Sequence, residues 1–134
     1  MLKQVSIYAE NRKGTFQKIT GILCEAGINI LGSVTNDSAE YGIVRMVVSE
    51  PDLACEVLTK EGYLCRLTDV IGIEVEDEVG NLNRLLTTLL DTNINVDYVY
   101  LSFNRDSGKP IMVFHVEDPY QVSESLKSKG YTSL

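Results

Sequence analysis

The sequence predicts an α+β fold in which the order β-α-β-β-α-β occurs twice. KGTFQKITGILCEAGINI (residues 13–30) matches VGNLNRLLTTLLDTNINV (79–96) at an offset of 66. Further on the offset is 68, where EGY (61–63) lies over KGY (129–131). Within each copy, β-branched runs alternate with apolar residues at helical spacing. This split βαβ order predicts two ferredoxin-like repeats, each an antiparallel sheet with its helices on one face.

The helices and strands of the first copy can be predicted from its sequence. Phe16, Ile19, Leu23 and Ala26 share one face at helical spacing, which predicts an amphipathic helix. Pro51 opens a second helix, as proline tends to do in a first helical turn, and Gly62 ends it. We expect strands over residues 4–10, 27–36 and 41–49, and a short last strand after the second helix.

The second copy repeats these elements. Leu82, Leu85, Leu86 and Leu89 predict its first helix, and its second helix lies between a proline and a glycine, Pro119 and Gly130. We expect strands over residues 70–76, 93–104 and 110–117, with a very short last strand. The two extra residues fit the polar turn 104–110, which is longer than the turn 36–41. The predicted domains are 1–68 and 69–134.

Composition excludes several classes of function. The net charge of −7 argues against non-specific binding to nucleic acid or to an anionic membrane. No apolar run approaches the roughly 20 residues that span a bilayer, and the N-terminus lacks the pattern of a signal peptide, so we expect a cytoplasmic protein.

The cysteines and the histidine indicate no metal or redox centre. Cys24, Cys55 and Cys65 form no CxxC pair, and with His115 as the only histidine a zinc site is not expected. We interpret the cysteines as free, small core residues, and His115 as a structural or surface residue in a strand. No nucleophile, general acid–base pair or cofactor motif is present, so the sequence predicts no cofactor.

The glycine between the first strand and the first helix of each copy marks a candidate site. Gly14 follows Asn11, Arg12 and Lys13, and the amides of the first helical turn together with two cations make a plausible cradle for a carboxylate. The equivalent loop is Glu76, Asp77, Glu78, Val79 and Gly80, whose carboxylates repel an anion but can accept from an ammonium. Both glycines can also be explained as parts of tight turns, and neither loop matches a nucleotide-binding motif.

Two asparagines add to this hypothesis. Asn29 and Asn95 occupy the same position in the two copies, within the predicted second strands and, in our interpretation, close to the glycine loops. Asparagine is a poor strand former, which leaves either turn chemistry or a side chain that serves a ligand.

The stretch ENRKGTF…GINI resembles the signature of the ACT-domain family, small regulatory modules that bind amino acids. The family's loop commonly reads Glu-Asn-Arg-Pro-Gly, and Lys13 stands at the proline position here. The resemblance covers essentially the whole chain as two tandem copies. It implies that ligand contacts come from Asn11, Asn29 and the backbone from Arg12 to Thr15, with Asp77, Val79, Gly80 and Asn95 as the less well matched equivalents.

This resemblance implies a free-standing, non-enzymatic regulator that binds a small amino acid between two repeats and acts on a separate partner, such as a metabolic enzyme. We expect a homodimer, because Val99, Leu101 and Phe103 alternate with Tyr98 and Tyr100 along a strand, although the two copies could also cover each other. An interaction module with a degenerate pocket is the alternative. An acylphosphatase-like hydrolase that uses Arg12 is a more remote one.

Overall fold

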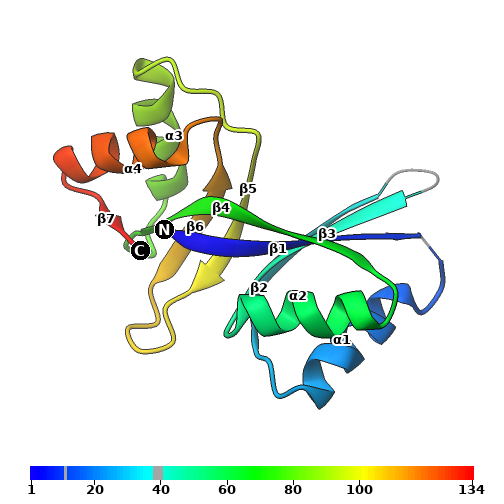
Figure 1. The fold of residues 1–134 in the computed structure, drawn as a ribbon. Coiled ribbons are helices and arrows are strands. Elements are labelled where there is room, and N and C mark those ends of the chain that lie inside the picture. Colours follow the sequence, from blue (N-terminus) through cyan, green and yellow to red (C-terminus); the bar gives the residue numbers. More distant parts are fainter. Residues whose placement is uncertain (11, 38–40) are drawn as a thin grey trace. The chain divides into compact units, whose positions relative to one another are not determined.

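A computed structural model describes residues 1–10, 12–37 and 41–134 (Figure 1). The chain divides into two compact units. The first unit is Lys3–Thr68, and the second unit consists of Asp69–Leu134 together with Met1–Leu2. The turn expected over 36–41 includes residues 38–40, which lie outside the described part of the chain.

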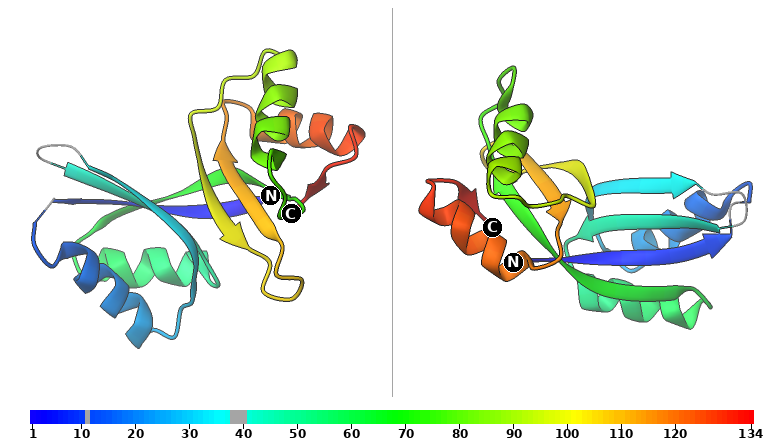
Figure 2. Two further views of the ribbon diagram at one scale, coloured as in Figure 1. Left: turned by 180° about the vertical axis from the view of Figure 1, so that it is seen from behind. Right: turned by 90° about the horizontal axis from the view of Figure 1, so that it is seen from above.

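The first unit follows the predicted order of elements. They are β1 (Leu2–Glu10), α1 (Thr15–Glu25), β2 (Ile30–Asp37), β3 (Tyr41–Val48), α2 (Pro51–Lys60) and the beginning of β4 (Leu64–Glu74). The strand order is β2-β3-β1-β4, and the β1–β3 and β2–β3 pairs are antiparallel. Both helices cover one face of this sheet (Figure 2).

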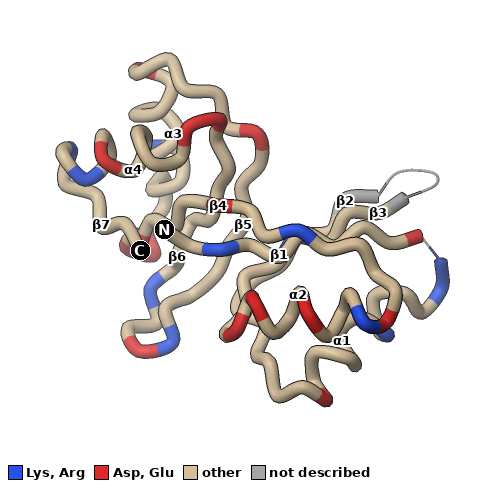
Figure 3. The backbone as a smooth tube through the Cα atoms, viewed as in Figure 1, with Lys and Arg blue, Asp and Glu red and all other residues tan. Residues whose placement is uncertain are grey.

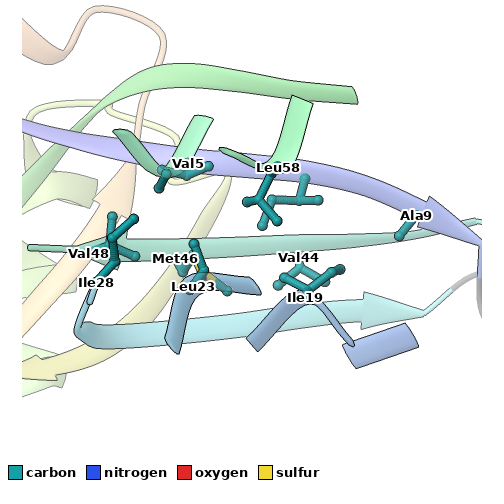
Figure 4. Packing of buried hydrophobic residues seen from close by; sticks show 11 residues of the cluster. Val5, Ala9, Ile19, Leu23, Ile28, Val44, Met46, Val48 and Leu58 are labelled. Carbon is teal, nitrogen blue, oxygen red and sulfur yellow. The ribbon is translucent and has the colours of Figure 1, made fainter. Parts of the chain in front are cut away.

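The core of the first unit lies between that face and the two helices. Residues of β1 and β3 that point toward the helices are buried, as are Ile19 and Leu23 of α1 and Leu58 of α2 (Figure 4). Phe16, which the helical spacing places on the same face, is exposed instead. It stands in the first turn of α1, beyond the end of the buried cluster.

The second unit uses the rest of β4 as its first strand. Its other elements are α3 (Asn81–Asp91), β5 (Tyr98–Phe103), β6 (Pro110–His115), α4 (Pro119–Ser128) and β7 (Thr132–Ser133). Antiparallel pairing gives the strand order β5-β6-β4-β7, which is the order of the first unit again. Leu85 and Leu89 of α3 and Leu126 of α4 are buried against this sheet.

Three of the sequence expectations about strands are wrong in detail. The strand expected over 27–36 begins only at Ile30. The short strand after Gly62 and the strand over 70–76 are one continuous element, β4, which runs from Leu64 to Glu74 through Asp69 and Gly72. The strand expected over 93–104 begins only at Tyr98, since the backbone of Asn93 has a positive φ of 58° and residues 93–97 form a loop. The ferredoxin-like order of both repeats is confirmed.

Candidate functional site

The first glycine loop, residues 10–15, joins β1 to α1 in the first unit. The amide of Arg12 donates to the carbonyl of Glu10 at 2.9 Å, and the amide of Thr15 donates to the carbonyl of Arg12 at 3.1 Å. Gly14 is the N-cap residue and has a left-handed backbone, with a φ of 86°. Asn11, which the resemblance assigns to the ligand, lies outside the described residues.

The second glycine loop, residues 76–81, has the same backbone. The amide of Glu78 donates to the carbonyl of Glu76 at 2.9 Å, the amide of Asn81 donates to the carbonyl of Glu78 at 3.3 Å, and Gly80 has a φ of 89°. A Cβ atom built on Gly14 or on Gly80 would meet nothing within 4 Å. Steric crowding therefore does not explain the glycine in either loop. The left-handed backbone explains it in both.

An open cavity of about 810 Å³ borders the first glycine loop. Its wall includes the turn from α2 to β4 as well as the loop itself. It is lined by Tyr8, Ala9, Glu10, Arg12, Lys13, Gly14, Thr15, Gln17, Lys18, Glu61, Gly62, Tyr63 and Leu64.

The charges of this cavity favour an anion. Arg12 pairs with Glu10 at 2.6 Å between Nε and Oε2, so its charge is partly balanced. Lys13 and Lys18 form no ion pair with another described residue. Figure 3 shows the basic segment between β1 and α1. Together with the N-terminal amides of α1, these cations give a surface that attracts a carboxylate.

The equivalent cavity of the second unit is only about 210 Å³, and another cavity of about 380 Å³ borders the same loop at Asp77 and Gly80. Asn81, at the position of Thr15, is buried and donates from Nδ2 to the carbonyl oxygen of Glu76. Its Oδ1 accepts from Nη1 of Arg84, which stands at the position of Lys18. The second glycine loop thus has a hydrogen-bonded pair at the positions that Thr15 and Lys18 occupy in the first loop.

The β5–β6 turn holds one carboxylate of the second loop, Glu76, and one at the end of β4, Glu74. Lys109 Nζ lies 2.8 Å from Oε1 of Glu76, and Ser107 Oγ donates to Oε1 of Glu74 at 2.7 Å. The hydrogen bond and the charge of Glu76 raise the pKa of Lys109. Asp77 is exposed, and the side chain of Val79 is fully exposed and lies outside both cavities.

Asn29 and Asn95 do not lie close to the glycine loops, which corrects the interpretation from the sequence. Each precedes a strand instead of lying inside it, and each is separated from its loop by the length of a helix, α1 or α3. Eleven residues of helix extend roughly 16 Å. Because a helix that follows a strand runs back along the sheet, the loop and the asparagine occupy opposite ends of each unit.

The two asparagine ends also differ from each other. In the first unit, Asn29 exchanges two hydrogen bonds of 2.9 Å with Ser49, from its amide to Oγ and from the amide of Ser49 to its carbonyl. In the second unit, pairing stops at Asp97 and His115, and a cavity of about 500 Å³ opens around Asn95. Both bonds of Asn29 use its backbone, so they do not account for its side chain, which borders a cavity of about 390 Å³. The side chain of Asn95 donates from Nδ2 to Asp97 at 3.4 Å.

The remaining predictions concern the cysteines, a metal and a membrane. The three cysteines are free, but Cys24 is exposed and Cys55 and Cys65 are only half-buried, so interpreting them as core residues is wrong for Cys24. Among residues 1–10, 12–37 and 41–134, no group of three or more His, Cys, Asp or Glu side chains could hold a metal ion. In the same part of the chain, no helix is long and apolar enough to cross a membrane.

Sequence reasoning missed two parts of this site. It did not assign Asn81, although the repeat alignment places it over Thr15 and would have revealed a larger polar side chain at the first helical position. It also missed the turn from α2 to β4, whose EGY motif returns as KGY in the second copy and whose Gly62 and Tyr63 line the larger cavity.

The duplicated βαββαβ order and the two matching glycine loops define a tandem protein of ferredoxin-like repeats. The chain belongs to the ACT domain pair family, which it matches over residues 1–131. The comparison with curated protein sequences finds no match.

Solved structures agree with this family. The chain is similar to protein BT0572 from Bacteroides thetaiotaomicron, with 29% identity and a TM-score of 0.89 over 99% of this chain and 91% of that one. It is also similar to the ligand-free regulatory subunit of aspartate kinase from Thermus thermophilus, with 16% identity and a TM-score of 0.66 over 92% and 87% of the two chains. At that identity the second likeness concerns the fold alone.

Proposed function

We propose that this protein is a non-enzymatic regulator that binds a small amino acid where two ACT repeats meet, and that it acts on a separate protein in the cytoplasm. The observation that carries this proposal is the first glycine loop. It borders an open cavity of about 810 Å³ that Lys13 and Lys18 line, and neither lysine forms an ion pair with another described residue; at the second loop, Asn81 and Arg84 hydrogen-bond to each other instead. One anion-binding loop per chain is therefore expected, not two equal ones.

The opposite placement of loop and asparagine explains why two repeats are needed. A small amino acid is far shorter than the roughly 16 Å that α1 spans between Gly14 and Asn29. A ligand that contacts one glycine loop and one asparagine end must therefore receive them from different repeats. We propose that a second copy of the protein supplies the other part, which makes the active form a homodimer.

The structural neighbours support a regulatory role. The similar protein from Thermus thermophilus is named as the regulatory subunit of aspartate kinase, so a chain of this fold can serve as a subunit that regulates an enzyme. By analogy, ligand binding here would stabilise one arrangement of the repeats, and a partner enzyme would respond to that change.

A thermal-denaturation screen against the twenty amino acids, each at millimolar concentration, tests this function. A ligand at about 100 times its Kd stabilises a protein by roughly 2.7 kcal/mol, which raises the Tm of a chain of this size by several degrees. One selective shift would support the proposal and identify the effector. If none of the twenty shifts the Tm, the interaction module with a degenerate pocket becomes the better hypothesis.

Two variants then test the site. Asn11→Ala and Lys13→Ala should each weaken binding of the selected amino acid. Lys13→Ala should leave the Tm of the free protein unchanged, because the side chain of Lys13 is exposed. Lys129→Ala, an exposed lysine at the end of α4, is the matched control and should bind normally. Undiminished affinity in both loop variants would refute the assignment.

A further inference from the structure

The thiols of Cys55 and Cys65 lie in contact in the first unit, although they belong to different elements. Cys55 is on α2 and Cys65 is near the start of β4, and the two side chains share a hydrogen bond. The hydroxyl of Thr59, one helical turn further along α2, forms another hydrogen bond with Cys65. Positions 55 and 59 share one face of the helix, so Cys65 packs against that face. The fold thus brings together two thiols that form no CxxC motif in the sequence.

The second unit shows the same contact between two serines. Ser123 of α4 and Ser133 of β7 stand at the positions of Cys55 and Cys65, at the offset of 68 that aligns this part of the two copies. Their hydroxyl oxygens lie 2.9 Å apart. Serine and cysteine differ only in the atom attached to Cβ, so the backbone of a repeat places two short side chains tip to tip at these positions. The contact is therefore a property of the fold and recurs with different side chains.

The surroundings of the pair admit a small reagent and hinder a large one. Cys55 and Cys65 are both half-buried, and Cys65 packs at the margin of the buried core of the unit. Cys24, the third cysteine, is exposed on α1. All three are free, which is the state that a reducing compartment maintains. An oxidant would therefore change the state of the pair within one chain, whereas Cys24 is the thiol that another chain can reach.

We propose that Cys55 and Cys65 form an intramolecular disulfide when the protein meets a peroxide. A thiolate attacks one oxygen of hydrogen peroxide, the O–O bond breaks, the sulfur becomes a sulfenic acid, and the hydroxide that leaves takes up a proton as water. The second thiol then attacks this sulfur, the S–O bond breaks, and the departing hydroxide takes the thiol proton as a second water. Two thiols lose two protons and two electrons in total, and these reduce one peroxide to two waters. A dithiol such as dithiothreitol reverses the step.

The two cysteines have different parts in this reaction. Burial, and then the neighbouring Cys55, raises the pKa of Cys65 to about 11, so Cys65 keeps its proton at neutral pH. Since the thiolate is the form that attacks a peroxide, the first attack falls to Cys55. Cys65 then resolves the sulfenic acid, because its sulfur already lies against that of Cys55. A disulfide is about 2.05 Å long, shorter than a hydrogen bond between two thiols, so its formation draws α2 and β4 together at this point.

The turn from α2 to β4 connects the pair to the loop cavity. This turn, residues 61–64, lies between the two cysteines in the sequence and lines the cavity of about 810 Å³. The amides of Gly62 and Tyr63 donate to carbonyls of α2 at 3.0 and 3.1 Å, so the turn follows the end of the helix. For the amino acid of the proposed function, on which this step alone rests, we expect the affinities of the disulfide and dithiol forms to differ by at least about fivefold, the lower end of typical coupling between sites.

Peptide mapping of the full chain tests the disulfide. Cys24→Ser removes the thiol that could link two chains, and trypsin cleaves after Lys60, between the two cysteines. After treatment with hydrogen peroxide and alkylation of the remaining thiols, we expect a monomer that has lost two hydrogen atoms, with residues 46–60 linked to residues 61–66. Dithiothreitol should restore two thiols that can be alkylated. If both thiols stay free at a dose that oxidises the exposed Met1, or if links form only between chains, the proposal is overturned.

A shifted cysteine separates direct contact from chain flexibility. Glu56 follows Cys55 on α2, and its side chain is exposed and pairs with Lys60 at 3.2 Å. The double variant Cys55→Ser with Glu56→Cys therefore keeps two thiols at almost the same separation in the sequence but moves one of them away from Cys65. In the Cys24→Ser background, this variant should form the linked peptides at least about tenfold more slowly than its parent. Equal rates would contradict the proposal.

Single variants test the order of attack. Dimedone labels a sulfenic acid and leaves a thiol unlabelled. In the Cys24→Ser background, Cys65→Ser should leave a sulfenic acid on Cys55 that dimedone labels, whereas Cys55→Ser should leave Cys65 as an unlabelled thiol at the same dose of peroxide. Labelling of Cys65 alone would show that the assigned order is wrong.

The results for the disulfide and for the proposed function are distinguishable. If the linked peptides form but no amino acid changes the Tm of either form, the regulator function fails and the disulfide stands. If an amino acid stabilises the protein but no linked peptides form, the function stands and the disulfide is wrong. If the amino acid binds both forms with equal affinity, the connection between the disulfide and the cavity is wrong.

Discussion

The two glycine loops have nearly the same backbone and very different side chains. Gly14 and Gly80 have φ values of 86° and 89°, and the same amide-to-carbonyl bonds close both turns. Yet one loop borders a single cavity of about 810 Å³, whereas the other borders two smaller ones, of about 210 and 380 Å³. The repeated glycine is therefore a requirement of the turn, and the capacity to bind a ligand has to be inferred from the residues around it.

The two asparagine ends differ in their polar partners. The amide and the carbonyl of Asn29 form hydrogen bonds with Ser49, whereas Asn95 donates from Nδ2 to Asp97. A cavity borders each end, of about 390 Å³ beside Asn29 and of about 500 Å³ around Asn95. The asparagine end is therefore open in both units, and the units differ in the side chains that line it.

Asn81→Ala should have the largest effect on stability among the loop variants. Its side chain is buried and makes two hydrogen bonds, one of them with the charged Arg84, so we expect a loss of about 2 kcal/mol in the free energy of unfolding. Thr15→Ala, the same position in the first loop, should cost less than about 0.5 kcal/mol. Urea denaturation measures both, and equal losses would mean that the hydrogen bonds of Asn81 do not stabilise the second loop.

Exchanging loop chemistry tests the difference in charge. The double variant Arg12→Glu with Lys13→Val replaces the two cations of the first loop by the residues found at these positions in the second. It should weaken binding of the amino acid selected by the thermal screen by at least about tenfold, or about 1.4 kcal/mol. Isothermal titration calorimetry measures this affinity. The free energy of unfolding should stay nearly constant, because both side chains are exposed. Unchanged affinity would mean that the carboxylate of the ligand is bound elsewhere than at this loop.

Replacing the glycines tests what the loops share. Gly14→Ala and Gly80→Ala should each destabilise by about 1 kcal/mol, because alanine is strained at a positive φ even where nothing crowds its Cβ. Asparagine tolerates this backbone better, so Gly14→Asn and Gly80→Asn should cost less. Thermal unfolding of the four variants measures the differences. A large cost at one glycine only would show that the two turns are not equivalent.

The sequence predicted most of the fold because the repeat doubled every signal. Pro51 and Pro119 marked the same helix start twice, and apolar spacing identified both cores. The positions of the site were less predictable. Whether Asn29 lies near Gly14 depends on the direction in which α1 runs back along the sheet, and the filling of the second loop depends on one side-chain conformation, that of Asn81. Local sequence patterns specify neither the direction of a helix relative to the sheet nor the conformation of a single side chain.

The two units also differ at one pair of positions whose ionisation matters at alkaline pH. Cys55 and Cys65 of the first unit correspond to Ser123 and Ser133 of the second, whose hydroxyl oxygens lie 2.9 Å apart. Burial, and then the neighbouring Cys55, raises the pKa of Cys65 from 9.0 to about 11. The folded protein therefore keeps this proton at pH values where the unfolded chain has released it.

It follows that the contribution of Cys65 to stability is fully present below pH 9.0 and is lost as the pH rises through about 11. Cys65→Ser gives the first unit the serine of the second, which does not ionise in this range, so the variant should lose less stability than the wild type over the same interval. Urea denaturation of both proteins across it measures the difference, in which the shared ionisation of the tyrosines cancels. Parallel pH profiles would mean that the Cys65 thiol titrates alike in the folded and unfolded chains, and that the two units do not differ at this pair.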